Sequence, residues 1–174
     1  MPRPKKLSHI VFRTNRLDEM VQWYLTATDS HVVYRGPRSC FITYDEEHHR
    51  IGFVLKPELT EQTKDHVGVE HIGFTFETLD DLLAAYVELR DRQVVPRYCT
   101  NHGPTTSFYY SDPDGNHVEL LLDNYTDPKD ADRFVASDAY RANPSGLRFD
   151  PELLLRRAKE GVPISRLTAY EPLT

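Results

Sequence analysis

The strongest constraint on the fold of this chain is an internal repeat, the pattern His-Ile-x-Phe. It occurs at residues 9–12 and again at residues 71–74. Each histidine opens a run rich in β-forming residues, so the chain reads as two copies of one small unit. A lone carboxylate, Glu119, follows late in the second copy. Two imidazoles and one carboxylate can hold iron(II) on one face and leave the other face open, which suggests a metal site where the copies meet.

Each copy combines one helical pattern with four strand-like runs. Apolar residues recur at helical spacing over 17–25 and over 79–89. Asn15 and Thr78 are the predicted N-caps of these two helices. Residues 112–115 carry Asp, Pro and Gly at the positions that favour a type I turn. Strands are predicted at 7–13, 31–35, 40–44 and 50–55 in the first copy, and at 70–76, 97–100, 106–111 and 117–122 in the second.

These elements predict an α+β fold. Both copies read as βαβββ modules, the first at about 6–58 and the second at about 66–123. We expect the modules to form one mixed sheet that encloses a cleft, within a single domain spanning residues 1–174. A C-terminal helical tail follows at 124–174, in which Asp150 is the predicted N-cap of a helix.

The composition excludes several classes of function. The chain has 174 residues, 39% of them hydrophobic and 28% charged, which is typical of a globular protein. A net charge of −6 gives no electrostatic reason to expect nucleic acid, and no apolar run reaches the roughly 20 residues of a membrane span. The only cysteines, Cys40 and Cys99, make no disulfide framework. We therefore expect a cytoplasmic protein that acts on small molecules, with nitrogen and oxygen ligands for any metal.

His9, His71 and Glu119 are the candidate metal ligands. Taken alone, each histidine is also typical of a half-buried strand residue that is hydrogen-bonded in a core. The two occupy equivalent points of the repeat, however, and burying an imidazole twice at a strand start is costly without a partner. Glu119 lies in the apolar run 118–122, so it either needs a partner such as a cation or faces water on an edge strand. The matching run 51–55 has no carboxylate, which predicts three protein ligands.

Two further groups are candidates for acid–base chemistry. His102 and Tyr109 lie on neighbouring predicted strands, and Tyr109 shares a predicted hairpin with Glu119. A phenol and an imidazole beside a metal can hold and deprotonate an oxygen ligand, although either residue alone is also typical of packing or of a surface loop. His48 and His49 precede a strand. Because adjacent strand residues point to opposite faces, only one of these two can face a cleft.

Residues 100–119 resemble the signature of the type I extradiol ring-cleaving dioxygenases, within the vicinal oxygen chelate superfamily. They contain, in order, a His, a spacer, an apolar–Tyr pair, an acidic-Pro-x-Gly turn and a Glu. The segment 48–51 resembles the part of that family that carries an acid/base histidine, which maps to His49. The resemblance covers roughly residues 7–123, and the ending around Asn143-Pro144 resembles the small one-domain members.

The resemblance implies both a fold and a function. The fold is the glyoxalase/bleomycin-resistance/dioxygenase fold, and the activity is cleavage of a catechol-type aromatic diol with O2 at a non-haem Fe(II) site, in the catabolism of aromatic compounds. Familiar members have two such domains, whereas this chain has a single pair of modules, and we expect a homo-oligomer. The implied Fe(II) ligands are His9, His71 and Glu119, with His49 as acid/base, Tyr109 as partner of the substrate oxygen and His102 as stabiliser of the bound intermediate. The strand residues considered for a ring-binding wall are Phe53, Phe74 and Phe108.

Two alternatives remain open. One is another metal enzyme on the same scaffold, either a glyoxalase-like isomerase or a thiol transferase. A glyoxalase-like site would need a fourth ligand, whereas a thiol transferase shares the three-ligand count. The other is a metal-free module that sequesters a planar drug, which tightly bound iron would exclude.

Overall fold

The chain folds into two compact units, each built around one mixed sheet. The computed structural model describes residues 1–61, 63 and 67–174. The units consist of Met1–Gly68 with Asp112–Asn116, and of Val69–Ser111 with His117–Thr174. The order βαβββ occurs once in each, and this confirms the predicted α+β class. The expectation of one mixed sheet is wrong, because the described strands of each module pair only among themselves and with the tail strand, which gives two sheets. The predicted start of the second module, at about residue 66, lies outside the described residues.

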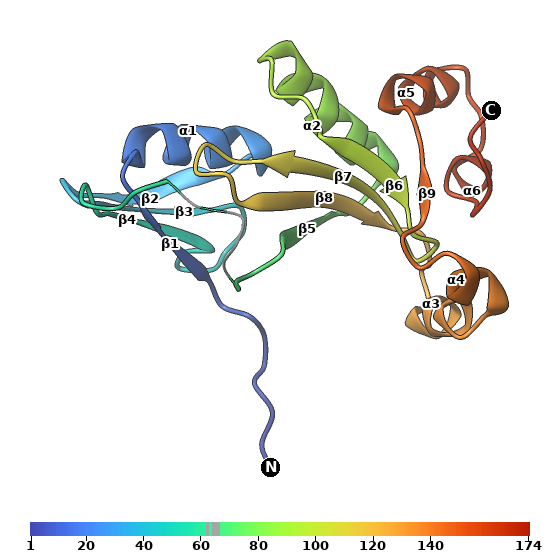
Figure 1. The fold of residues 1–174 in the computed structure, drawn as a ribbon, viewed down its shortest axis with the longest axis horizontal. Coiled ribbons are helices and arrows are strands. Elements are labelled where there is room, and N and C mark those ends of the chain that lie inside the picture. The colour runs from blue at the N-terminus through green and yellow to red at the C-terminus, as the bar shows by residue number, and fades with distance from the viewer. Residues whose placement is uncertain (62, 64–66) are drawn as a thin grey trace. The chain divides into compact units, whose positions relative to one another are not determined.

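The first unit is a four-stranded sheet with one helix (Figure 1). Its elements are β1 (Ile10–Thr14), α1 (Leu17–Ala27), β2 (His31–Arg35), β3 (Ser39–Thr43) and β4 (Ile51–Leu55). The strand order is β1-β4-β3-β2, with β1 parallel to β4 and the other neighbours antiparallel. Helix α1 lies across one face of this sheet, where the buried ring of Tyr24 packs against Phe53 of β4, with 5.5 Å between ring centroids.

The two predicted helix caps have different outcomes. The N-cap of α1 is Arg16, which makes no side-chain capping hydrogen bond, so the assignment of Asn15 is wrong. Asn15 instead donates from Nδ2 to the carbonyl of Leu59 at 2.9 Å, which ties the start of the helix to the segment after β4. The cap predicted for the second helix is confirmed, because the side chain of Thr78 accepts a hydrogen bond from the backbone N–H of Asp81.

The second unit has a five-stranded sheet and a longer helix on one face (Figure 1). Its elements before the tail are β5 (Ile72–Phe76), α2 (Leu79–Asp91), β6 (Tyr98–Asn101), β7 (Thr105–Ser111) and β8 (His117–Asp123). The strand order is β5-β8-β7-β6-β9, in which β9 (Leu147–Arg148) comes from the tail. Strands β5 and β8 are parallel, and the other neighbours are antiparallel.

Alternate residues of the second sheet point to opposite faces. Phe108 of β7 and its register partner Leu120 of β8 are fully buried, and the Phe108 ring packs against Tyr86 of α2. Phe74 also pairs with Leu120 and shares this helix-covered face. Phe53 is likewise buried beneath α1. The idea that these phenylalanines line a ring-binding wall is therefore wrong for Phe53 and Phe108, because the helices cover them.

The C-terminal tail adds four helices and one short strand. The helices are α3 (Pro128–Val135), α4 (Asp138–Ala142), α5 (Pro151–Lys159) and α6 (Ile164–Leu167). The predicted cap of α5 is confirmed, since the side chain of Asp150 accepts from the backbone N–H of Glu152. Strand β9 pairs antiparallel with β6, so the tail extends the sheet, which the sequence pattern did not predict.

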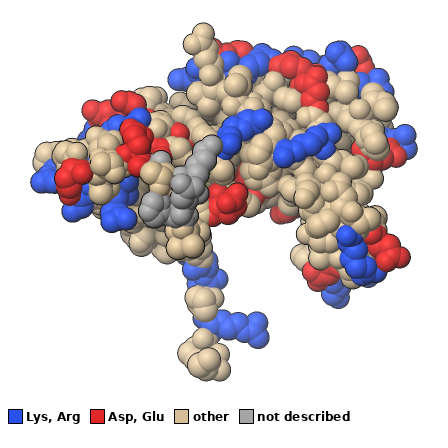
Figure 2. All heavy atoms as spheres, in the orientation of Figure 1, with Lys and Arg blue, Asp and Glu red and all other residues tan. Residues whose placement is uncertain are grey.

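The surface carries both signs of charge. On the face shown in Figure 2, Lys and Arg side chains are interspersed with Asp and Glu. No helix in the described parts of the chain combines the length and the apolar character that crossing a membrane requires.

Candidate metal and catalytic site

Four polar side chains of the second unit form a continuous chain of contacts. His71 Nε2 lies 3.0 Å from Glu119 Oε2. The other carboxylate oxygen, Oε1, accepts a hydrogen bond of 2.6 Å from the Tyr109 hydroxyl. That hydroxyl in turn lies 3.0 Å from Nε2 of His102. The structure thus brings together four of the six residues singled out from the sequence, and we refer to this surface as the polar face.

The register of the sheet places the polar face opposite the side covered by α2. Tyr109 pairs with Glu119 across β7 and β8, and Glu119 pairs with Gly73 across β8 and β5. A Cβ on Gly73 would lie 3.4 Å from Glu119 Oε2 and 3.1 Å from the side chain of Leu121, so the glycine leaves room for the carboxylate. His71 immediately precedes β5, and its position puts the imidazole beside the same carboxylate.

Burial controls the protonation of the polar face. Glu119 is only 6% exposed, and a buried carboxylate needs a cation or hydrogen-bond donors to offset its lost hydration. Burial and the hydrogen bond to Glu119 raise the pKa of Tyr109 well above its ordinary value, so the phenol stays protonated near neutral pH. Burial lowers the pKa of His102, although Glu119 opposes the shift, and this favours a neutral imidazole.

The first unit holds the other two residues singled out from the sequence. The rings of His9 and His49 stack with 4.3 Å between centroids, and the ring of His48 lies 5.8 Å from that of His9. One ring nitrogen from each of these histidines lies within 4.8 Å of the others, a spacing that could hold one cation. Burial, followed by the neighbouring His9 and His48, lowers the pKa of His49. A neutral His49 has a lone pair with which to accept a proton.

A charged network fixes the backbone that leads into His9. The guanidinium of Arg50 donates to the carbonyls of Leu7 and Ser8, at 2.9 and 3.1 Å. Asp45 holds the same guanidinium through both carboxylate oxygens, at 2.7, 2.9 and 3.1 Å. The hydrogen bonds from Arg50 lower the pKa of Asp45 to about 2. The position of His9 therefore depends on two residues that the sequence analysis did not single out.

The two units differ at the positions that carry polar groups in the second. Glu119 of β8 lies beside Tyr109 of β7. At the corresponding register positions of the first unit, Gly52 of β4 lies beside Phe41 of β3. The first unit thus presents a glycine and a phenyl ring where the second presents a carboxylate and a phenol. This difference agrees with the expectation that the first copy supplies no carboxylate ligand.

The available donor atoms fit a divalent metal ion. His71 and Glu119 offer an imidazole nitrogen and a carboxylate oxygen that are 3.0 Å apart. His9 is a further imidazole at the equivalent strand start of the first unit. Two histidines and one carboxylate are the ligand set of non-haem iron(II) oxygenases. The burial of Glu119 supports this fit, because a cation would supply the partner that a buried carboxylate needs.

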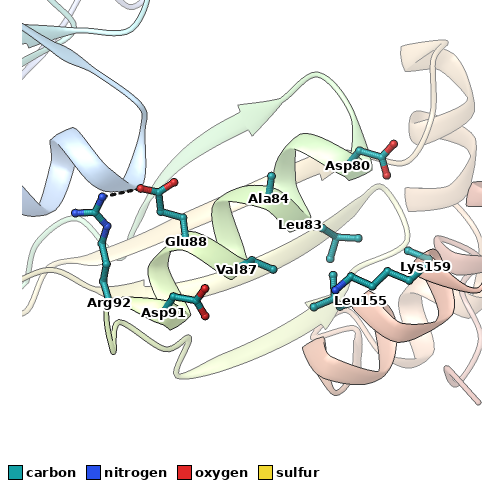
Figure 3. Close-up of a pocket in the computed structure, with 10 residues that line it drawn as sticks. Asp80, Leu83, Ala84, Val87, Glu88, Asp91, Arg92, Leu155 and Lys159 are labelled. Carbon is teal, nitrogen blue, oxygen red and sulfur yellow. Dashed lines mark hydrogen bonds and ion pairs between the residues drawn. The ribbon is translucent and has the colours of Figure 1, made fainter.

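A separate hollow of the second unit lies between α2 and α5 (Figure 3). Its floor is apolar and includes Leu83 and Val87 of α2 and Leu155 of α5. Asp80 and Lys159 add charge at its edge. Of the described residues, no histidine lines this hollow, and it lies on the helix side of the sheet. It therefore offers none of the chemistry of the polar face.

Three residues next to the polar face escaped the sequence analysis. Tyr98 stacks on Tyr109 with 4.5 Å between ring centroids, and the guanidinium of Arg148 lies 3.6 Å from the centroid of Tyr98. The backbone of Pro144 acts on His102 as well, because it opposes the lowering of the pKa of that imidazole. Arg148 and Pro144 come from the tail. Arg148 lies in β9, and a strand of this length gives no periodic signal that could have placed it.

Comparisons with known proteins agree with this geometry. The family described as Glyoxalase/Bleomycin resistance protein/Dioxygenase superfamily matches residues 6–120. The chain is 42% identical over 171 residues to Biphenyl-2,3-diol 1,2-dioxygenase 2 of Rhodococcus globerulus, which covers 98% of this chain and 90% of that protein. It is 45% identical over 165 residues to Biphenyl-2,3-diol 1,2-dioxygenase 3 of the same organism, which covers 94% of this chain and 87% of that protein. The likeness therefore extends beyond the modules into the tail.

Solved structures share the fold at low sequence identity. A glyoxylase/bleomycin resistance protein/dioxygenase domain from Frankia sp. EAN1pec has a TM-score of 0.58 and 17% identity, with 70% of this chain and 99% of that chain covered. A lactoylglutathione lyase from Agrobacterium tumefaciens has a TM-score of 0.56 and 15% identity, with 70% of this chain and 96% of that chain covered. At such identities the likeness concerns the fold alone.

Proposed function

We propose that this chain, which belongs to the Glyoxalase/Bleomycin resistance protein/Dioxygenase superfamily, is an extradiol dioxygenase that opens the ring of a catechol-type aromatic diol with O2. The observation that carries the proposal is the polar face, where a buried carboxylate, a phenol and two imidazoles are in contact. Such a surface combines metal ligands with groups that can hold and return a proton. Two relatives named as biphenyl-2,3-diol dioxygenases support a diol substrate and a role in the catabolism of aromatic compounds.

The proposed cofactor is iron(II), with His9, His71 and Glu119 as its ligands. When bound, the ion supplies Lewis-acid and electron-transfer chemistry and keeps coordination positions open for small ligands. A glyoxalase-like isomerase would need a fourth ligand, and Gly52 occupies the position from which the first unit would have to supply it. The donor set therefore favours oxygenase chemistry over isomerase chemistry.

The chain's own residues handle the proton chemistry in this proposal. Tyr109, kept protonated by burial and by Glu119, is the group that donates a hydrogen bond to a substrate oxygen. His102, directed at the Tyr109 hydroxyl, stabilises the oxygen that gains charge. His49 is the proposed acid/base, because its lowered pKa leaves a lone pair that can take a proton from the diol and later return it.

One aromatic side chain of the second unit suits a planar substrate. Tyr98 stacks on Tyr109 with 4.5 Å between ring centroids. Aromatic rings gain from offset or edge-on contact with one another in addition to the area they bury. We propose that Tyr98, in place of the helix-covered phenylalanines, contacts the ring of the diol.

The assembly and location of the protein remain predictions. Both cysteines, Cys40 and Cys99, are buried and free, as expected in a reducing compartment such as the cytoplasm. We expect a homo-oligomer, because the chain has a single pair of modules with a long tail. Sedimentation velocity of the purified chain measures the state of assembly, and a monomer at working concentration would contradict this expectation.

The test of the proposed function is anaerobic purification with ferrous iron, followed by a spectrophotometric scan in air. The scan uses catechol, methylcatechols and 2,3-dihydroxybiphenyl. We expect a yellow ring-opened product from at least one diol, with consumption of O2. The controls are the metal-free chain and 2-hydroxybiphenyl, which lacks the second hydroxyl, and neither should give product. Iron-loaded protein that consumes neither O2 nor any of the diols would contradict the proposal.

A further inference from the structure

We infer that Asn101 and Phe134 are positioning residues for His102, because both connect the turn that carries His102 to the C-terminal tail. This turn joins β6 to β7, and a 2.9 Å hydrogen bond from the N–H of His102 to the carbonyl of Thr105 closes it. The effect on turnover rests on the proposed function. The position of the His102 ring does not, because it is a property of the folded chain.

The side chain of Asn101 joins this turn to the end of the tail. Asn101 is buried, and its Oδ1 accepts a hydrogen bond of 2.8 Å from the N–H of Gly103. Its Nδ2 donates to the carbonyls of Thr168 and Ala169, at 3.0 and 2.9 Å. Because a backbone N–H can only donate and a carbonyl can only accept, these three contacts fix the orientation of the amide. One buried side chain therefore holds the turn and the tail end together.

The tail end that receives these hydrogen bonds is itself fixed. The backbone N–H and the hydroxyl of Thr168 both donate to the carbonyl of Ile164, at 2.9 and 3.0 Å. Thr168 and the preceding residue, Leu167, are buried. The two acceptor carbonyls therefore lie in a packed part of the second unit.

A second contact from the tail covers Gly103, the residue that follows His102. Gly103 has a φ of +92°, and a Cβ there would lie 1.9 Å from Cε1 of the Phe134 ring. The ring therefore lies directly against the backbone of the turn. The ring of Tyr170 packs edge-on against Phe134, with 4.9 Å between ring centroids. The carbonyl of Gly103 accepts a further hydrogen bond of 2.8 Å from Asn124 Nδ2.

The position of the turn matters because His102 reaches the polar face from it. Its Nε2 lies 3.0 Å from the hydroxyl of Tyr109, which donates to Glu119. A hydrogen bond weakens steeply as its angle closes, so a small displacement of the turn would weaken the contact with Tyr109. Asn101 and Phe134 contact the backbone beside His102, and we expect their effect on the polar face to pass through this imidazole.

The variant Asn101→Ser separates the tail contact from the turn. A serine hydroxyl can still accept from the N–H of Gly103, as serine does in turns of this kind, but it is too short to reach the two tail carbonyls. The matched control is Asn15→Ser. Asn15 Nδ2 likewise donates to a distant backbone carbonyl, that of Leu59, at 2.9 Å, and both residues belong to the first unit.

Nitrogen-15 NMR of the metal-free, full-length chain labelled at histidine reports the surroundings of the His102 ring. The His102 signals are assigned by their loss in His102→Gln. We expect Asn101→Ser to shift these signals and Asn15→Ser to leave them at their wild-type positions. Wild-type His102 signals in Asn101→Ser, or equal shifts in both variants, would overturn the inference.

Turnover of the diol by iron-loaded chains tests the catalytic consequence. Asn101→Ser should lower kcat by about 10²-fold, the scale of a misplacement of about 1 Å, with iron content retained and a smaller change in KM. The same substitution in the His102→Gln chain should lower kcat little further, because the residue that Asn101 positions is already absent. An equal factor in both backgrounds would show a merely structural defect and would overturn the inference. Asn15→Ser should keep the wild-type kcat.

A milder pair covers the outcome in which Asn101→Ser does not fold. Phe134→Leu removes the ring that lies against Gly103, and it changes α3, a helix without buried residues. The control, Val135→Ala, shortens the exposed neighbour on the same helix. Only Phe134→Leu should shift the His102 signals, and wild-type signals in this variant would contradict the inference. If the wild-type chain converts no diol, the proposed function fails, while the NMR signals still decide whether the tail positions His102.

Discussion

Among single residues, Glu119 is the one on which the polar face depends. It is nearly buried, and its two oxygens contact His71 and Tyr109. A carboxylate in such surroundings is costly to the fold unless a positive charge or several donors compensate its lost hydration. The cation proposed at this site would supply such a positive charge.

The His49→Phe variant is expected to retain its bound iron and to turn over the diol about 10²–10⁴-fold more slowly. This factor is the usual rate contribution of general acid–base catalysis. The new phenyl ring can still stack on Phe41, so a loss of activity would come from the missing imidazole nitrogens. Steady-state turnover of the diol, normalised to iron content, measures the effect. An unchanged rate would move the acid–base role to Tyr109 or His102.

The matched control is His48→Phe. His48 is the adjacent residue, its ring is exposed, and its Nδ1 lies 2.9 Å from Glu47 Oε1. We expect little change in turnover and full retention of iron. Loss of iron from this variant would show that the cluster of His9, His48 and His49 is the metal site instead.

The side chains of the polar face could be proposed from the sequence. The neighbouring residues that contact them or affect their pKa could not. Tyr109 and Glu119 lie on either side of a recognisable turn, so their pairing across a hairpin follows from strand geometry. Pro144 affects the pKa of His102 through its backbone, a group that every residue carries, so no residue type marks it. Arg148 acts on the polar face only through its tertiary contact with the ring of Tyr98, and the local sequence pattern does not encode such a contact.

At the scale of elements, the repeat predicted the order of strands and helices because each module has its own hydrophobic periodicity. The turn predicted at 112–115 forms with a 2.9 Å hydrogen bond from the N–H of Gly115 to the carbonyl of Asp112. The cap of α1 could not be predicted, since Asn15 is used for a contact with Leu59, far along the chain. Tertiary contacts of this kind override local preference.

The pair formed by Asp45 and Arg50 makes the stability of the first unit depend on pH. The pKa of Asp45 falls from 3.8 to about 2 in the folded chain, chiefly through hydrogen bonds from Arg50. The folded state therefore binds this proton less readily than the unfolded state. The pair stabilises the fold above about pH 3.8, and this contribution is lost as the pH falls toward about 2.

Asp45→Asn should lower the free energy of unfolding at neutral pH and flatten its decline over that acidic range. Urea unfolding at a series of pH values measures both quantities. The control is Glu46→Gln, which removes an adjacent exposed carboxylate and should keep the wild-type pH dependence. Wild-type and Asp45→Asn chains with the same dependence would contradict the assignment.

At the scale of the whole molecule, the proposed ligands come from both units, His9 from the first and His71 and Glu119 from the second. A metal that binds only the folded chain stabilises it by mass action. Bound iron is thus expected to raise the stability of the folded chain.

Ferrous iron should raise Tm in anaerobic calorimetry. At a free concentration 100 times Kd, the stabilisation is about 2.7 kcal/mol. EDTA should reverse the shift, and Mg²⁺, which prefers oxygen ligands, should produce little of it. An equal shift with Mg²⁺, or none with iron, would argue against the proposed ligand set.

The central claim is that His9, His71 and Glu119 hold one ferrous ion. It is tested most directly by the iron content of anaerobically loaded chains. The account predicts one iron per wild-type chain, loss of iron and turnover in His9→Ala, His71→Ala and Glu119→Ala, and retention of both in His48→Ala. Stoichiometric iron with a normal rate in any of the three ligand variants would contradict it.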